Sequence, residues 1–411
     1  MNIFYKNLAH SNLIIFFISS LILGPFFPDL IVSLSSFFFL FYLFRHKSYF
    51  YFTIKPLIIF FIFCIYCILV SIFFAKDILL SFGSSLFYFR IGVFSCLIWY
   101  LLEQDKKILN YFYYALVISF LALIVDGYIQ FFTGTNIVGL TKAGDRISSF
   151  FGNELIMGSY LSRLFPLLFA LFIVKEKKKL ELYVMIFFFV LLSGLVLISG
   201  ERASFFLYVL SFIFIIIFVK GYTKLKTIFL VGSLIITIII ISSFDQVKNR
   251  ILSDPKSTIT KFIFTPAHDS LIRTAYNMFL DKPLFGHGPK MFRVICKDEK
   301  YAVGITPCMS HPHNFYVQLL AETGIIGFSF LFSAFAYVLY CAYRQLKSIV
   351  LRQKRYLTNY QVCLLAGILI TVWPLTTNGN FFHNWLMIVY SLPVGFYLHS
   401  IYGKNRTNIS F

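Results

Sequence analysis

Long runs of apolar residues, separated by short polar segments, cover most of the chain. Each run has roughly 17 to 25 residues, the length with which a helix crosses about 30 Å of hydrocarbon. We therefore expect about twelve transmembrane helices. They are predicted over residues 10–27, 28–44, 55–75, 82–102, 109–132, 155–174, 180–199, 203–219, 227–243, 323–343, 358–377 and 381–401. The pattern predicts an all-α, polytopic integral membrane protein.

One long polar stretch, residues 244–312, interrupts this pattern. Its charged and turn-rich sequence, for example Asp281-Lys-Pro-Leu-Phe-Gly-His-Gly288, is typical of short helices joined by turns. We predict three parts. They are the first nine transmembrane helices in residues 1–243, a large helical loop domain in 244–312, and the last three helices with a cytoplasmic tail in 313–411.

Composition and charge support a membrane protein. Hydrophobic residues make up 59% of the 411 positions and charged residues only 13%, whereas about a quarter of the residues of a soluble domain are charged. The net charge of +19 comes largely from Lys and Arg clustered between alternate apolar runs, and such clusters mark cytoplasmic loops. The short loops on the other side contain only Lys76, Lys142, Arg146 and Arg202. We predict cytoplasmic termini and an outward-facing loop domain, with no soluble basic surface for nucleic acid.

The most informative motif is His313-Asn314, then nine intervening residues, then Gly324 and Gly327. Other motifs accompany it along the chain: Arg146-Ile-Ser-Ser-Phe-Phe-Gly-Asn153, Ser199-Gly-Glu-Arg202, Arg273 with the 281–288 segment, and Asn380-Phe-Phe-His-Asn-Trp385. In this order, and at the end of the large polar stretch, they resemble the O-antigen ligase family of the O-antigen ligase and polymerase superfamily. The resemblance covers most of residues 140–400.

The resemblance implies a glycosyltransferase of the bacterial inner membrane, active at the periplasmic face. The sequence contains no pattern typical of a metal or nucleotide site, so we expect neither metal nor cofactor. It would move a glycan from a polyprenyl diphosphate carrier, such as undecaprenyl diphosphate, to a hydroxyl of the lipid A core, with inversion at the anomeric carbon. His313 is the expected general base, and Arg202 and Arg273 are expected to bind the diphosphate. Further candidates for substrate binding are Arg146, Arg163, His311 and Asn314.

The chemistry of His313 is consistent with this role. An unperturbed imidazole has a pKa near 6.5, so it can accept a proton from a sugar hydroxyl at neutral pH. If the chain is helical from this point, residues 313, 317, 320, 324 and 327 share one face. A continuous helix from 313 to 343 would be about 46 Å long, so its first turns must protrude or bend. The alternative is that His313 only caps the helix.

The charged residues near apolar runs also have alternative interpretations. Arg202 can hold a diphosphate with its forked guanidinium, or snorkel, or pair locally with Glu201. Arg273 can instead lie on a solvated helix face. Three ionisable residues lie within predicted spans and are expected to face a cavity or an ion-pair partner: Arg90, Asp126 and Arg163.

Two pairs of cysteines are expected to differ in role. Cys64 and Cys67 lie within an apolar run without a second ligand pair, so we interpret them as buried apolar residues rather than metal ligands. Cys296 and Cys308 lie on the predicted outer face, in an oxidising compartment, and are expected to form a disulfide.

Three other functions remain open. The same superfamily includes O-antigen polymerases and protein O-oligosaccharyltransferases, whose acceptors are a glycan and a polypeptide. From a different class, a lipid-linked sugar transporter would also need many spans and intramembrane arginines. A transporter favours matched repeats and broken helices near the midplane, whereas the polar motifs here gather at one outer face.

Overall fold

The structure is a computed structural model that describes residues 3–47, 52–175, 178–252 and 265–404. Residues 253–264 of the predicted loop domain and 405–411 of the predicted tail lie outside the described residues.

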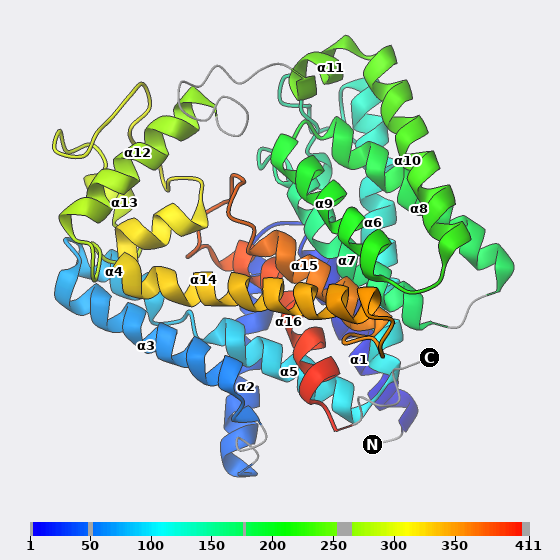
Figure 1. Ribbon diagram of the computed structural model, residues 1–411, viewed down its shortest axis with the longest axis horizontal. Coiled ribbons are helices and arrows are strands. Elements are labelled where there is room, and N and C mark those ends of the chain that lie inside the picture. Colours follow the sequence, from blue (N-terminus) through cyan, green and yellow to red (C-terminus); the bar gives the residue numbers. More distant parts are fainter. Residues whose placement is uncertain (1–2, 48–51, 176–177, 253–264, 405–411) are drawn as a thin grey trace.

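The described chain is built from helices (Figure 1). In the residues described, two isolated β-bridges between 135 and 146 are the only extended pairing. The helices are α1 (Ile3–Ser20), α2 (Phe26–Arg45), α3 (Lys55–Phe74), α4 (Ile78–Ser85), α5 (Arg90–Gln104), α6 (Lys107–Thr133), α7 (Met157–Val174), α8 (Lys179–Ile198), α9 (Arg202–Phe218), α10 (Thr223–Ser243), α11 (Asp245–Leu252), α12 (Pro266–Asp281), α13 (Phe292–Ile295), α14 (Phe315–Val350), α15 (Asn359–Thr371) and α16 (Asn384–Tyr402).

Nine helices in the described part of the chain are long and apolar enough to cross a membrane, with α4 and α5 counted together. Three shorter apolar helices accompany them: Ser11–Ser20 within α1, α9 and α15. In chain order these helices correspond one for one to the predicted apolar runs. The prediction of an all-α polytopic membrane protein is therefore confirmed.

Helix α7 lies at the centre of the bundle. Nearly every side chain from Met157 to Ile173 is buried, as expected for a helix that is apolar on all sides. It packs against α6, α8, α9, α15 and α16. The packing of α15 and α16 on α7 is important for the candidate site, because the loop between these two helices supports it.

The charged residues within or next to predicted spans have protein partners. Arg90 begins α5 and forms an ion pair with Asp29 of α2, with 2.5 Å between Nη2 and Oδ1. Asp126 of α6 is fully buried and accepts hydrogen bonds from the Ile137 main-chain N–H at 2.9 Å and from Asn136 Nδ2 at 3.2 Å. These partners satisfy charges that would otherwise be costly within a membrane.

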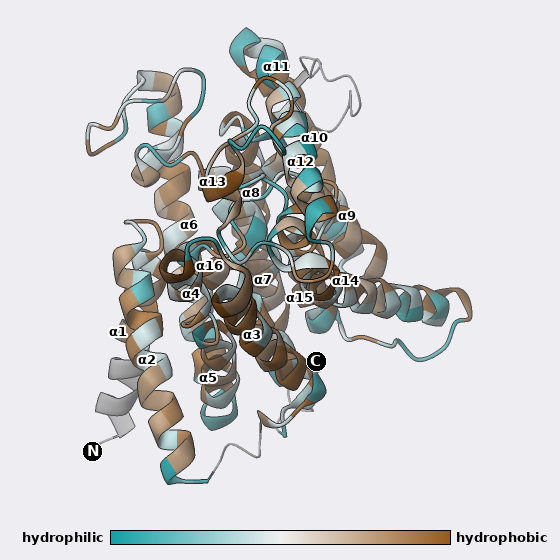
Figure 2. Cartoon of the chain, turned by 90° about the vertical axis from the view of Figure 1, so that its left-hand side faces the viewer, coloured by the Kyte–Doolittle hydropathy of each residue, from teal (hydrophilic) through white to brown (hydrophobic). Residues whose placement is uncertain are grey.

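The two ends of the described chain lie away from the helical part of the loop domain. In Figures 1 and 2 the N- and C-terminal ends are in the lower part of the view, whereas α11 and α12 are at the top. Figure 2 also contrasts the hydrophilic colours of α11 and α12 with the hydrophobic colour of α3. The cytoplasmic placement of both termini and the periplasmic placement of the polar segment remain predictions.

Candidate functional site

His313 lies immediately before α14 rather than within it. Its backbone has a φ of 56°, in the left-handed region, and the helix begins at Phe315. Asn314 is the N-cap, and its Oδ1 accepts from the main-chain N–H groups of Tyr316 and Val317 at 3.0 and 3.1 Å. The prediction that His313 shares a helix face with the residues after it is therefore wrong, because Asn314 is the N-cap and the helix begins only after it.

The loop between α15 and α16, residues 372–383, holds this turn in place. The Asn378 main-chain N–H donates to the His313 carbonyl oxygen at 2.8 Å. The Asn314 Nδ2 group donates to the carbonyl oxygens of Pro374 and Thr376 at 2.8 and 3.2 Å. Asn314, a candidate for substrate binding from the sequence, thus contacts the protein with both ends of its amide.

Arg163 of α7 holds the 372–383 loop in place through hydrogen bonds. Its Nη1 donates to the Ile370 carbonyl oxygen at 2.7 Å, and its Nη2 donates to Asn378 Oδ1 at 2.8 Å. The guanidinium also lies 4.1 Å from the centre of the Tyr390 ring. With 2% of its surface exposed, Arg163 supports the loop that supports His313.

The two glycine-containing motifs of the sequence fit together at a break in α14. Gly324 has non-helical backbone angles, with φ at 65°. The carbonyl oxygens of Ala321 and Glu322, on the N-terminal side of this break, accept from the main-chain N–H groups of His287 and Gly288 at 3.1 and 2.8 Å. On its other side, the Ile325 N–H donates to the Pro283 carbonyl oxygen at 2.8 Å.

The break leaves no space for a side chain at Gly324. A Cβ there would lie 2.2 Å from the Leu284 carbonyl oxygen, and one at Gly286 would lie 2.5 Å from the Glu322 carbonyl carbon. The predicted need for the long helix to protrude or bend is thus met by a break, and the 281–288 segment supplies the lost hydrogen bonds.

A buried carboxylate lies beside this break and was not identified from the sequence. Glu322 Oε2 accepts from Gln318 Nε2 at 3.0 Å, and Oε1 accepts from the Phe292 N–H of α13 at 3.1 Å. Gln318 also donates to Asn380 Oδ1 at 2.9 Å and accepts from the Phe381 N–H at 2.9 Å. One network therefore joins α13, α14 and the 372–383 loop.

Three histidines gather at the start of α14. The ring centres of His311 and His313 are 4.0 Å apart, and those of His268 and His313 are 5.3 Å apart. His268 comes from the first turn of α12, where Thr265 Oγ1 lies 2.8 Å from its Nδ1. The sequence analysis missed His268, because 45 residues along the chain separate it from His313 and no local spacing signals their contact.

Burial keeps these imidazoles neutral. It lowers the pKa of His313 below its usual value of 6.5. Burial, reinforced by the neighbouring His313, lowers the pKa of His311 to about 3 and that of His268 to about 4. A neutral imidazole can accept a proton, so His313 is in the protonation state that a general base requires at neutral pH.

Cys296 and Cys308 are bonded to each other, with 5.0 Å between their Cα atoms. Cys296 is fully buried in a small apolar cluster formed by α12, α13 and the start of α14. The members of this cluster are Leu271, Ala275, Met278, Phe292, Ile295, Cys296, Tyr301 and Ala321. The bond therefore ties the segment before the histidines to the core of the loop domain.

A group of three arginines, Arg146, Arg202 and Arg250, lies around Gly200. The Arg202 Nε donates to the Arg250 carbonyl oxygen at 2.6 Å, and the Arg250 Nε donates to the Gly200 carbonyl oxygen at 3.3 Å. A Cβ at Gly200 would lie 3.0 Å from Arg146 Cγ and 3.7 Å from Arg250 Cγ. Arg250, of α11, had no motif to identify it in the sequence.

Glu201 turns toward the start of α7. Its carboxylate accepts from the main-chain N–H groups of Gly158 and Ser159 at 2.7 and 3.1 Å, and from Ser204 Oγ at 2.8 Å. Burial raises the pKa of Glu201, and these donors and Arg146 oppose the rise. The carboxylate therefore stabilises the N-terminal end of the central helix.

Arg273 lies on an exposed face of α12. Half of its side-chain surface is exposed, and its Nη1 is 3.9 Å from Asp269 Oδ2, one turn earlier. This matches the predicted alternative of a solvated helix face. The same helix carries His268, so α12 connects the histidine cluster to Arg273. Among the described residues, no group of three or more His, Cys, Asp or Glu is arranged to hold a metal ion.

The fold and the site define a polytopic membrane protein with histidines and arginines around a helical loop domain. Residues 187–332 match the family model described as O-Antigen ligase. This range includes Arg202, Arg273, His313, Gly324 and Gly327. The resemblance to the O-antigen ligase family that the sequence indicated is therefore confirmed over this part of the chain.

A relative with a described role is the Teichuronic acid biosynthesis protein TuaE of Bacillus subtilis (strain 168). The two proteins are 25% identical over 122 residues, which make up 30% of this chain and 25% of the relative. The matched region thus spans about a quarter of the length of that relative.

Proposed function

We propose that the protein is a glycosyltransferase that moves a glycan from a polyprenyl diphosphate carrier to the lipid A core at the periplasmic face of a bacterial inner membrane. The observation that carries the proposal is the placement of His313. Its backbone is held by Asn378, its ring adjoins two further histidines, and burial lowers its pKa. The match to the O-antigen ligase family supports the class of reaction.

In the proposed reaction, the oxygen of an acceptor hydroxyl attacks the anomeric carbon of the donor glycan. The hydroxyl proton passes to the neutral imidazole of His313. The bond between the anomeric carbon and the diphosphate oxygen breaks, and the diphosphate leaves with the electron pair. Attack from the side opposite the leaving group inverts the anomeric centre.

The departing diphosphate requires positive charge. Arg202, together with Arg146 and Arg250 around Gly200, forms a concentration of guanidinium groups suited to oxygen anions. Preorganised cations contribute most where negative charge develops during the reaction. We assign Arg202 to the diphosphate, with Arg273 joining it when substrate displaces the weak contact to Asp269. This assignment makes the reaction independent of metal ions.

The second candidate is a polymerase that joins repeat units on the polyprenyl carrier. The name of the Bacillus subtilis relative favours it, because that protein is assigned to teichuronic acid biosynthesis rather than to O-antigen attachment. A polymerase would use the same histidine and arginines, with the growing glycan in place of lipid A core.

Deletion of the gene separates the two candidates by the product that remains. A ligase acts after polymerisation, so its loss should leave long glycan chains on the polyprenyl carrier and unmodified lipid A core. A polymerase acts earlier, so its loss should leave lipid A core with a single repeat unit. We expect the first pattern, and single-repeat lipid A core would move the assignment to the polymerase.

A further inference from the structure

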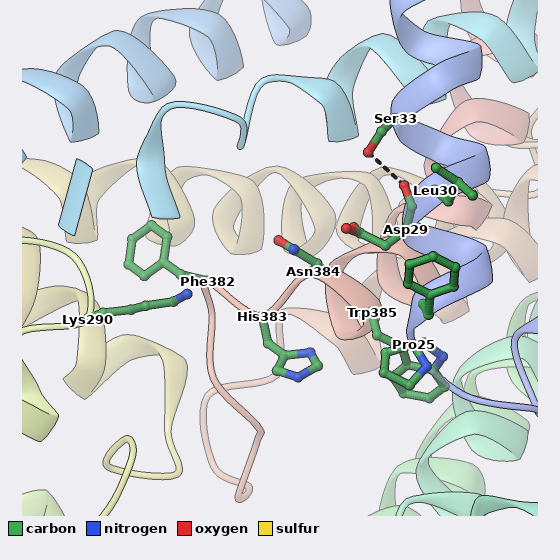
Figure 3. Close-up of a pocket in the computed structure, with 10 residues that line it drawn as sticks. Pro25, Asp29, Leu30, Ser33, Lys290, Phe382, His383, Asn384 and Trp385 are labelled. Carbon is green, nitrogen blue, oxygen red and sulfur yellow. Dashed lines mark hydrogen bonds between the residues drawn. The ribbon is translucent and has the colours of Figure 1, made fainter. Parts of the chain in front are cut away.

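A cavity of about 570 Å³ lies between the first turns of α2 and α16 (Figure 3). Its volume is within the range of cavities that hold small-molecule ligands. It contains none of the residues that the sequence singled out for catalysis or diphosphate binding. The lining residues are Pro25, Phe26, Asp29, Leu30, Ser33, Lys290, Phe382, His383, Asn384 and Trp385.

One wall of the cavity presents hydrogen-bond donors. Lys290 has a left-handed backbone, with φ at 60°, and Figure 3 shows its ammonium group beside Phe382 at the cavity. Lys290 follows the 281–288 segment, which forms backbone hydrogen bonds with α14. These bonds hold the backbone next to Lys290 in place. Burial lowers the pKa of Lys290 and the nearby Arg293 lowers it further, whereas Glu322 raises it.

His383 and Asn384 add neutral donors to the same wall. His383 is the N-cap of α16, and its Nδ1 accepts from the Leu386 N–H at 3.4 Å. In the neutral ring the proton is then on Nε2, which is left as a donor. Burial lowers the pKa of His383 and so favours this neutral form. The Asn384 amide supplies a third donor group, beside the positive end of the α16 dipole.

The opposite wall, on α2, presents oxygen atoms and an apolar rim. The charge of Asp29 is compensated by its ion pair with Arg90. Lys290 is the other charged residue of the lining, and among the described residues it forms no ion pair within the cavity. Asp29 and Ser33 can accept from sugar hydroxyls. Phe26 is 68% exposed and Leu30 is 41% exposed, on a helix long and apolar enough to cross the membrane.

We propose that this cavity binds an anionic sugar, bearing a phosphate or carboxylate group, of a membrane-anchored glycan. The ammonium group of Lys290 and the donors of His383 and Asn384 would hold the anion, Asp29 and Ser33 the hydroxyls, and the rim at Phe26 the first part of the lipid. An anion surrounded by one cation and several neutral donors is better satisfied here than in an apolar groove.

The cavity is electrostatically connected to the histidine cluster. Arg293 and His383 both lower the pKa of His311, and Arg293 also lowers that of His383. The loop that holds His313 through Asn378 also ends at Phe382 and His383 of the lining, so a glycan held in the cavity would lie beside the element that positions His313. This role in transfer rests on the proposed function, whereas binding to the cavity does not.

Photo-crosslinking in membranes that contain the full chain and its glycolipids tests the proposal. A photoreactive phenylalanine analogue replaces Phe26, and the captured lipid is identified by mass spectrometry. The matched control carries the analogue at Phe37, which is 67% exposed on the same helix but does not line the cavity. We expect glycolipid with an anionic sugar at Phe26 and bulk phospholipid at Phe37. Phospholipid alone at both positions would overturn the proposal.

The mass of the captured glycolipid distinguishes its two sources. An adduct that contains a polyprenyl diphosphate chain identifies the donor, and a glycolipid with fatty acyl chains identifies the acceptor. Either result supports the proposal when a sugar of the captured glycolipid bears a phosphate or carboxylate group, and capture of glycolipids with only neutral sugars would overturn it.

Charge variants test the contribution of the ammonium group. Lys290→Gln should reduce the glycolipid adduct about tenfold, the effect of losing one charge-assisted hydrogen bond. Lys290→Arg should retain the adduct, as should Lys297→Gln, which removes the same charge from an exposed position nearby. An unchanged adduct in Lys290→Gln, or an equal loss in Lys290→Arg, would overturn the role of this charge.

A His313→Ala variant separates this inference from the proposed function. The adduct at Phe26 should persist in that variant although transfer is lost. An absent adduct in a protein that still transfers glycan overturns the cavity assignment alone. If the adduct at Phe26 persists but the His313→Ala variant transfers glycan normally, the proposed mechanism alone is overturned.

Discussion

The main-chain N–H of Asn378 donates a 2.8 Å hydrogen bond to the carbonyl oxygen of His313. The Asn378 side chain accepts from Arg163 Nη2, also at 2.8 Å. A histidine with a φ of 56° is strained, and such backbone persists only where surrounding contacts hold it. The candidate base is therefore positioned by a buried arginine on the central helix, 150 residues earlier in the chain.

His313→Ala should lower the rate of glycan transfer by about 10²- to 10⁴-fold, the usual contribution of a general base. The variant should remain inserted, because the hydrogen bond to Asn378 uses the backbone of His313 rather than its ring. Transfer is measured in membranes, with the Cys296–Cys308 disulfide as a check on folding. His46→Ala, at the far end of α2, should transfer normally. Near-normal transfer by His313→Ala would remove this residue from the mechanism.

The rate of transfer should stay constant from neutral pH to below pH 6.5 and then fall. A general base acts in its deprotonated form, which predominates above its pKa. Burial lowers the pKa of His313 below 6.5, so protonation removes the base only when the pH falls through that lowered pKa. A pH–rate profile at saturating donor checks this. An acidic limb centred above pH 6.5 would contradict the assignment.

Arg202→Lys should reduce transfer about ten- to a hundredfold, although the positive charge is retained. An ammonium group cannot form the paired hydrogen bonds that a guanidinium offers to a diphosphate, and each charge-assisted bond contributes about 1.5–3 kcal/mol. The measurement is the initial rate of transfer at equal protein levels. Arg344→Lys, on the part of α14 remote from the site, is the control. Full activity in Arg202→Lys would limit this residue to anchoring its helix.

Gly324→Ala should destabilise the protein by at least about 2 kcal/mol, because the residue has a positive φ and a Cβ would overlap the Leu284 carbonyl. The loss of contact between α14 and the 281–288 segment should also reduce transfer. Thermal unfolding of the purified protein measures the first effect. Gly83→Ala is the matched control, since a Cβ there meets nothing within 4 Å. Equal stability of the two variants would show that the break tolerates a side chain.

Reporter fusions should place Lys106 and Lys354 in the cytoplasm and Lys142 and Asp298 in the periplasm. The reason is the clustering of Lys and Arg in alternate loops, which remain on the cytoplasmic side. Paired reporters that are active in only one compartment give the answer for each position. A periplasmic signal at Lys354 would overturn the predicted arrangement of the last three spans.

The sequence by itself determined the helices and the motifs around the site. Runs of apolar residues are read locally, since each helix satisfies its own backbone hydrogen bonds and its length is matched to the membrane. The sequence also predicted that α14 must protrude or bend, because a helix from 313 to 343 is longer than the hydrocarbon is thick. The disulfide between Cys296 and Cys308 was also predicted from the sequence, because both cysteines lie on the predicted outer face of the membrane.

Only the tertiary structure decided how these parts meet. Gly324 breaks its helix because the 281–288 segment supplies hydrogen bonds from another part of the chain, and no periodicity in α14 indicates that partner. His268 joins His313, and Arg250 joins Arg202, through contacts between helices that are distant in sequence. The cavity at Lys290 likewise depends on three separate segments. Such contacts follow from packing between elements, which a pattern along one segment cannot specify.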